Sequence, residues 1–203
     1  QPPREGYPFG TAQGSYDIFY GMVWGTRTAF RIGIIVVGFS SLLGITIGTL
    51  SAYYGGKIDE FFMRITDVFM SIPFIIATIV LVTILGQGLT NVMIALITFS
   101  WMSTARLMRS QVLSVKEDEF VQAALALGAN DFRIIFRHII LNTIFPVVIQ
   151  ASMRMGSMVI TASALSFLGV GAPEGYADWG QMITFARDWI LGGQGSALKY
   201  WYT

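Results

Sequence analysis

Long apolar stretches constrain the fold of this chain more than any other feature of its sequence. Four stretches are close to or above the ~20 residues that a helix needs to cross a bilayer, and each holds a single charged residue. Only 12% of all residues are charged, against about 25% in soluble proteins, so too little polar helix would remain to cover a soluble core. The sequence therefore predicts an all-α, polytopic bundle of transmembrane helices that forms one domain over residues 1–203. The predicted spans are 28–54, 67–85, 89–107 and 139–170.

The same composition excludes several classes of function. The chain has no cysteine and one histidine, His138, so neither a thiolate site nor a histidine-rich metal site is expected. The net charge of +1 and the scarcity of charge argue against a nucleic-acid partner. The carboxylates lie in loops or at the ends of spans, which disfavours an intramembrane enzyme. We expect no catalytic residue, no metal and no cofactor held by this chain.

The distribution of basic residues predicts which side of the membrane each loop faces. Lys and Arg concentrate in the loops 55–66 and 108–138, and they are sparser over 1–27 and 171–203. Because basic residues accumulate in cytoplasmic loops, we place 55–66 and 108–138 in the cytoplasm and the other two segments outside. Aromatic residues beside a lysine at 197–203 indicate the start of a further span.

Small residues and a proline predict how the spans pack and bend. Gly44 and Gly48 belong to a stripe of small residues spaced four apart, which lets two helices approach closely in a membrane. Pro73 removes a backbone donor within the second span and predicts a kink there. We expect structural roles at these three positions.

Arg154 is the charge that lies deepest in a predicted span. An uncompensated arginine at such a depth costs about 2.5–3.5 kcal/mol on insertion scales, so we expect it to face the bundle interior or a wet cavity. With Gln150 one turn before it, Arg154 is a candidate for the translocation path. The alternative is a structural pairing with a carboxylate or with carbonyl groups of another helix, and both readings stay open. Arg31 is nearer the end of its span and is expected only to reach the membrane surface.

The loop 108–138, here called the coupling loop, predicts two short helices. Ser114 opens an S-x-x-E pattern that matches a capping box before a helix over 118–127. Gly128 predicts the end of that helix, and Asn130 predicts the N-cap of a second one. Exposed apolar residues on such helices favour docking on another protein. The alternative is a helix that lies on the membrane surface.

An ordered set of short motifs runs through most of the chain. Within the coupling loop the motif residues are Glu119, Phe120, Gln122, Ala123, Ala124, Gly128 and Ala129. Outside it, motifs stand at 8–11 (PFGT), 54–59 (YGGKID) and 165–171 (LSFLGVG), and Pro146 follows the coupling loop. Together they resemble the permease subunits of binding-protein-dependent ABC importers. The coupling-loop motif is similar to the EAA signature of that family, with glutamine in place of glutamate. The other blocks resemble the C-type permease of the dipeptide, oligopeptide and nickel branch.

The resemblance implies a type I ABC importer permease with a cytoplasmic coupling helix, and it assigns ATPase coupling to the seven motif residues. It implies one further span on each side of this sequence and a structural role for Pro146. It also places the protein in the inner (plasma) membrane of a prokaryote as a multi-pass protein surrounded by membrane lipid.

The same resemblance implies a set of partners and a cargo. These are a second permease, usually a different chain, two ATP-binding subunits and an extracytoplasmic substrate-binding protein. Di- or oligopeptides are the default cargo of this branch. The sequence lacks the pattern G-x-x-x-x-G-K-[ST], so ATP and Mg are expected on the separate ATPase subunits. The alternative function is a channel or secondary transporter that works without ATP.

Overall fold

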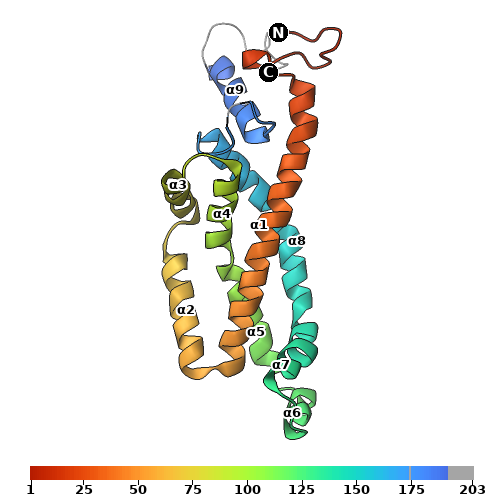
Figure 1. Cartoon of the computed structure of the whole chain (residues 1–203), viewed down its shortest axis with the longest axis vertical. Helices are drawn as coiled ribbons and strands as arrows, with labels where there is room; N and C mark the ends of the chain where they lie inside the picture. The colour runs from red at the N-terminus through yellow and green to blue at the C-terminus, as the bar shows by residue number, and fades with distance from the viewer. Residues whose placement is uncertain (174, 192–203) are drawn as a thin grey trace. The chain divides into compact units, whose positions relative to one another are not determined.

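The computed structural model describes residues 1–173 and 175–191 (Figure 1). In these residues the regular structure is helical, and the predicted all-α class is confirmed. The predicted start of a further span at 197–203 lies outside the described residues. The helices are α1 (Ile18–Tyr54), α2 (Gly56–Ser71), α3 (Phe74–Leu85), α4 (Leu89–Ser100), α5 (Met102–Val115), α6 (Glu119–Ala126), α7 (Asp131–Arg133), a π-helical segment (Ile134–Ile139), α8 (Ile140–Phe167) and α9 (Trp179–Leu191), preceded by a short 3-10 turn (Gln13–Ser15).

Two helical stretches are long and apolar enough to cross a membrane. One is α1, and the other runs without interruption from Asp131 to Phe167 through α7, the π-helical segment and α8. A third candidate is the pair of α2 and α3, which is bent by 88°. The described part of the chain therefore has two such helices, or three if the bent pair counts as one span.

Two of the predicted spans are divided between consecutive helices. The stretch 67–85 breaks at Ile72, whose backbone is extended because the residue before a proline avoids the helical region. Pro73 then precedes α3, so the predicted kink is present as a complete break. The stretch 89–107 is shared by α4 and α5, which meet at Trp101. Pro146 instead lies inside α8, which continues through it.

The chain clusters into two compact units, which we describe separately. Among the described residues, unit 1 holds 1–35, 78–95, 157–173 and 175–191, and unit 2 holds 36–77 and 96–156. The helices α1, α3, α4 and α8 each contribute to both units.

In unit 2, α1 packs tightly against α5 along the stripe of small residues. A Cβ atom added to Gly44 would lie 2.6 Å from the Thr104 Cβ, and one added to Gly48 would lie 2.3 Å from the carbonyl oxygen of Ala105. Since these separations are shorter than any real Cβ contact, both positions require glycine at this spacing of the helices.

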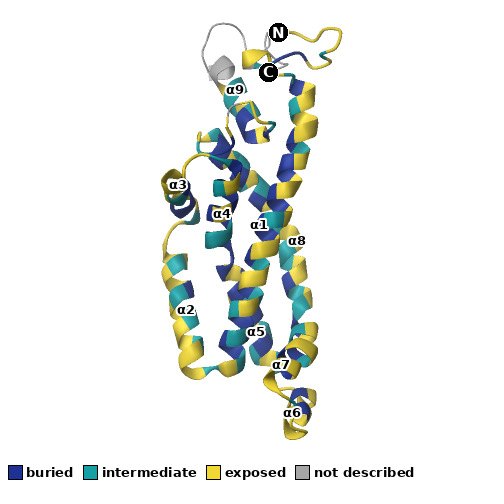
Figure 2. Ribbon diagram, in the orientation of Figure 1, coloured by how far each residue is buried: buried dark blue, intermediate teal, exposed yellow. Residues whose placement is uncertain are grey.

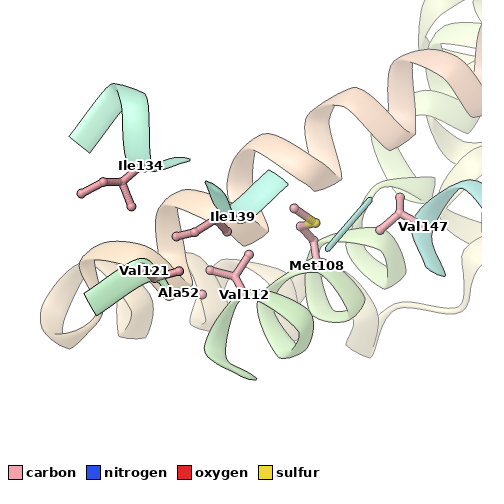
Figure 3. Packing of buried hydrophobic residues seen from close by; sticks show 7 residues of the cluster. All are labelled: Ala52, Met108, Val112, Val121, Ile134, Ile139 and Val147. Carbon is pink, nitrogen blue, oxygen red and sulfur yellow. The ribbon is translucent and has the colours of Figure 1, made fainter. Parts of the chain in front are cut away.

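An apolar cluster in unit 2 joins the end of α1 to the coupling loop (Figure 3). Its members come from α1, α5, α6, the π-helical segment and α8, and nearly all are fully buried. The cluster consists of Ala52, Met108, Val112, Val121, Ile134, Ile139 and Val147.

In unit 1, the loop before α9 is fastened to the first half of α1. Thr28 Oγ1 donates a 2.9 Å hydrogen bond to the carbonyl oxygen of Ala177, and Trp179 Nε1 donates one of 3.2 Å to Met22. Asp178 precedes α9, is only 3% exposed, and accepts a hydrogen bond from the backbone N–H of Gln181. Burial raises the pKa of the Asp178 carboxyl, and hydrogen bonds from neighbouring groups oppose that shift in part.

Candidate coupling site

The short helix α6 begins after Asp118, whose backbone is extended and whose carbonyl oxygen accepts hydrogen bonds from Val121 and Gln122. The capping box predicted at Ser114 is therefore wrong. Ser114 lies in the last turn of α5, which continues to Val115, so the backbone N–H groups that a cap would satisfy are still inside that helix.

The end of α6 is a left-handed glycine turn. Gly128 has φ +77°, its N–H donates to Leu125, and the N–H of Ala129 donates back to Ala124 at 3.1 Å. This pair of bonds is a Schellman motif, in which residues other than glycine are strained by about 1–2 kcal/mol. Two residues later the Asn130 side chain accepts a 2.9 Å hydrogen bond from Arg133 and caps α7. The helix end predicted at Gly128 and the cap predicted at Asn130 are thus confirmed.

One face of α6 is fixed to the rest of unit 2, and the other is open. On the fixed face Val121 is 1% exposed and belongs to the apolar cluster of Figure 3, and Ala124 is 8% exposed. Gln122 Nε2 also donates to the carbonyl oxygen of Lys116 at 2.9 Å, which ties α6 to the end of α5. On the open side Leu127 is 88% exposed, and Figure 2 shows most of α6 and the following turn as exposed.

The structure brings the seven predicted coupling residues together on α6 and its C-terminal turn. Five of them are exposed, and Ala129 is half-buried. Ala124 is buried, so it lies on the inner face of α6 rather than on the exposed face. The exposed five are Glu119, Phe120, Gln122, Ala123 and Gly128.

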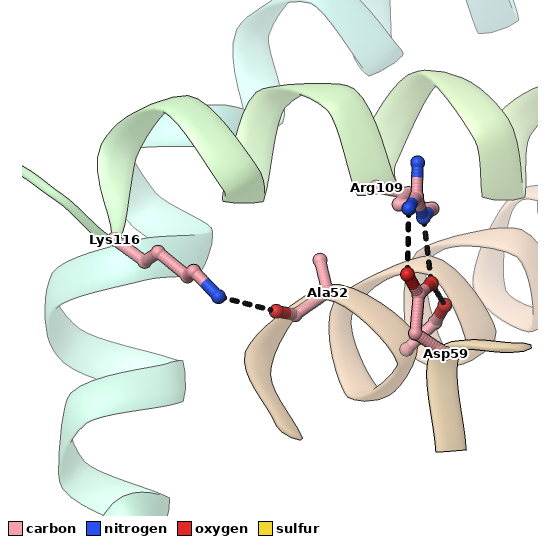
Figure 4. A network of polar contacts seen from close by, with 5 residues as sticks. Ala52, Asp59, Arg109 and Lys116 are labelled. Atoms are coloured by element: carbon pink, nitrogen blue, oxygen red, sulfur yellow. Dashed lines mark hydrogen bonds and ion pairs between the residues drawn. The ribbon is translucent and has the colours of Figure 1, made fainter. Parts of the chain in front are cut away.

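Three consecutive residues at the end of α1 connect it to three other segments of unit 2. Ser51 Oγ donates a hydrogen bond to the carboxylate of Asp59 in α2. The carbonyl oxygen of Ala52 accepts a 3.2 Å bond from Lys116 Nζ, which follows α5 (Figure 4). Tyr53 Oη donates a 2.8 Å bond to the carboxylate of Asp131 in α7. A lysine is favourable here because the last carbonyls of a helix lack helical partners and carry negative charge.

Asp59 is also held by a two-pronged ion pair. Arg109 Nε and Nη2 donate to its two carboxylate oxygens, each at 2.6 Å (Figure 4). One helical turn earlier on α5, Arg106 pairs with Asp67, so α2 and α5 are joined at two points. Two-pronged arginine–carboxylate pairs fix orientation as well as distance.

Sequence reasoning missed this network. Asp59 was identified only as part of the 54–59 motif, and neither Arg109 nor Tyr53 was predicted to have a role. The available signal was the spacing of Arg109 and Lys116, seven residues apart, which places both cations on one face of a helix.

Arg154 and Gln150, the two predicted path residues, meet around Thr104. Arg154 Nη1 donates to Thr104 Oγ1 at 2.8 Å, and Nη2 donates to the carbonyl oxygen of Ser100. Thr104 in turn donates to Gln150 Oε1 at 3.4 Å. The guanidinium is therefore bound by a hydroxyl and a carbonyl of other helices. The carbonyl bond is of the kind that the structural reading expects, and a place on the translocation path stays a prediction.

Comparison with known proteins gives consistent results along the chain. The family described as "Binding-protein-dependent transport system inner membrane component" matches residues 44–198. The dipeptide transport system permease protein DppC of Alkalihalophilus pseudofirmus is 38% identical over 190 residues, which are 94% of this chain and 62% of that protein. The glutathione transport system permease protein GsiD of Pectobacterium atrosepticum is 41% identical over 171 residues, 84% of this chain and 57% of that protein.

A third relative is the oligopeptide transport system permease protein OppC of Bacillus subtilis. It is 34% identical over 184 residues, 91% of this chain and 60% of that protein. The chain thus spans about six-tenths of the length of the curated relatives it matches. Among solved structures, a chain of the MetNI methionine ABC transporter in inward-facing conformations superposes with a TM-score of 0.72. It is 17% identical and covers 90% of this chain and 86% of its own length, which shows a common fold.

Proposed function

Since the chain belongs to the family of binding-protein-dependent transport system inner membrane components, we propose that it is a permease subunit of an ATP-driven importer. In this proposal it is a multi-pass protein of the prokaryotic inner membrane and forms half of the translocation path. It has no ATPase site, so two ATP-binding subunits hold ATP and Mg. A second permease, different in sequence, completes the path, and an extracytoplasmic binding protein delivers the cargo. Relatives named for dipeptide and oligopeptide transport support a cargo of short peptides.

The observation that carries this proposal is the two-sided character of α6. Its inner face is anchored by Val121 and Ala124, while Leu127 and Phe120 stand exposed beside it. A helix that is fixed on one side and apolar on the other is suited to dock into a cleft of a partner protein. We assign that cleft to the ATP-binding subunit.

The contacts of unit 2 supply a route for transmitting motion. A displacement of α6 pulls on α5 through the Gln122–Lys116 bond and on α1 through the shared apolar cluster. The adjoining helix α7 is tied to α1 by the Tyr53–Asp131 bond. The Asp59–Arg109 ion pair links α2 to α5, so α2 is expected to move together with α5. Alternating access needs such rigid-body rocking of packed helices around a fixed site. Arg154 and Gln150 are proposed to hold the wall of the path.

The experiment uses the purified complex in vesicles and measures peptide uptake and ATP hydrolysis together. Gly128→Leu should leave the complex in the membrane but lower uptake per ATP, because leucine is strained at φ +77° and the turn that positions α6 shifts. Gly38→Leu is the matched control, since a Cβ there meets nothing within 4 Å and its backbone is helical.

Unchanged coupling in Gly128→Leu would refute the role of α6. Uptake that continues without any ATP-binding subunit would instead identify a channel or secondary transporter.

A further inference from the structure

A pocket of about 710 Å³ in unit 1 lies between the first half of α1 and the loop 175–177. None of its lining residues belongs to the coupling loop. The α1 side of the pocket is formed by Tyr20, Trp24, Arg27, Thr28 and Arg31, which recur at helical spacing along one face. The pocket is therefore a groove of aromatic and basic side chains closed by a loop.

The walls of this pocket are held in place by the protein itself. Thr28 Oγ1 binds the carbonyl oxygen of Ala177 at 2.9 Å, and this bond fixes the loop on α1. The Trp179 ring lies so close to Gly25 that an added Cβ would be 2.6 Å from its Cδ1 atom. These contacts within the chain hold the two walls of the pocket, as is usual for small-molecule sites.

The described residues that line the pocket carry positive charge. Arg27 and Arg31 stand one turn apart, both are exposed, and the Arg27 guanidinium lies 5.6 Å from the centroid of the Trp24 ring. In the part of the chain that the structure describes, neither arginine forms an ion pair, and no carboxylate lines the pocket. Two adjacent guanidinium groups match the oxygen geometry of a phosphate.

The position of the two arginines along α1 fits the level of lipid headgroups. The charge-free stretch 32–54 is about 35 Å long at 1.5 Å per residue, which is enough to cross a hydrocarbon core of about 30 Å. Arg27 and Arg31 then lie at the membrane surface, where tryptophan and tyrosine are also enriched. Ile34 is exposed on the same face one turn deeper, in position to contact an acyl chain.

We propose that this pocket binds the phosphate group of an anionic phospholipid, with the acyl chains lying along Ile34. Arg31 then has a ligand-binding role beyond reaching the membrane surface. The phosphate chemistry is shared with free phosphate, and the experiment has to separate the two sources. The proposal does not depend on the importer function, because it is tested by binding in the absence of ATP.

The test is native mass spectrometry of the intact complex, titrated with phosphatidylglycerol and with phosphatidylcholine of identical acyl chains. A parallel titration uses inorganic phosphate. The wild type should prefer phosphatidylglycerol, and the double variant Arg27→Gln/Arg31→Gln should reduce that preference about fivefold for each arginine removed. Arg27→Lys/Arg31→Lys keeps both charges but lacks the planar guanidinium fork, so it should lower the preference by less than the glutamine variant does. Arg4→Gln, an exposed arginine stacked on Tyr7 outside the pocket, is the control and should behave as the wild type.

The possible results distinguish a lipid site from a site for free phosphate and from the absence of a site. A preference lost in the double glutamine variant and kept in the Arg4 variant supports the site. Binding of inorganic phosphate with the same dependence on the two arginines, without a lipid preference, supports the pocket and assigns it to free phosphate. The proposal is overturned if the wild type binds neither phosphatidylglycerol selectively nor phosphate, or if the Arg4 control loses binding equally. If the glutamine variant does not assemble, lipid binding by the lysine variant is compared with that of the wild type instead.

Discussion

The Tyr53–Asp131 hydrogen bond is the direct link from α1 to the second helix of the coupling loop, and its removal gives the sharpest test of transmission. Tyr53→Phe deletes only the hydroxyl that donates to Asp131 at 2.8 Å. A hydrogen bond to a charged group contributes about 1.5–3 kcal/mol, but Asp131 is exposed to solvent, so we expect about 1 kcal/mol. That energy corresponds to a roughly fivefold change in the equilibrium constant between the arrangement in which the coupling loop is attached to α1 and the one in which it is detached.

The assay is the ratio of peptide taken up to ATP hydrolysed by the reconstituted complex. We expect the ratio to fall roughly two- to fivefold in Tyr53→Phe, while ATP hydrolysis itself continues. Tyr54→Phe is the matched control, because Tyr54 is the exposed neighbour and its ring packs edge-on against Tyr53. Tyr54→Phe should keep the wild-type ratio.

A double-mutant cycle with Asp131→Asn separates this bond from other effects of each change. If the bond transmits motion, the double variant is no worse than the more impaired single variant, with a coupling energy near 1 kcal/mol. Strictly additive losses, or equal ratios for the Tyr53 and Tyr54 variants, would refute the reasoning.

Two further predictions concern the half-buried Arg154 and the buried Asp178. Arg154→Gln should lower the thermal midpoint of the complex and its uptake together, since it removes the charged hydrogen bonds to Thr104 and Ser100; an unchanged midpoint would contradict a role in holding the wall. Asp178 has a raised pKa, so the folded protein holds its proton more tightly than the unfolded chain, and stability falls as pH rises above the ordinary value of 3.8. Asp178→Asn should remove that part of the pH dependence of the thermal midpoint, and a pH profile identical to the wild type would contradict it.

The helical class and the coupling loop follow from the sequence because they rest on local signals. A long charge-free stretch predicts a span wherever it occurs, and a glycine followed by an asparagine two residues later predicts a helix end and a new cap. Gly128 and Asn130 are therefore where the sequence places them.

The contacts that join the helices of unit 2 to one another were beyond such reasoning. Tyr53 and Asp131 are 78 residues apart, and Arg109 and Asp59 are 50 apart. Pairing them requires knowledge of how α1, α2 and α5 pack, and this depends on Gly44 and Gly48 allowing a close approach. Likewise Ser114 satisfied a local capping pattern, but the packing of α5 extended that helix beyond it.

Site-directed cross-linking tests most directly whether the exposed side of α6 docks on the ATP-binding subunit. The chain contains no cysteine, so Leu127→Cys introduces a single reactive thiol at the most exposed apolar residue of the coupling loop. With a short bifunctional reagent in the assembled complex, we predict a cross-link from this cysteine to the ATP-binding subunit. We predict none from Phe145→Cys, which is comparably exposed on α8. A cross-link to the ATP-binding subunit from Phe145→Cys but not from Leu127→Cys would contradict docking by α6. So would labelling of Leu127→Cys by a lipid-soluble thiol reagent with no cross-link to the ATP-binding subunit.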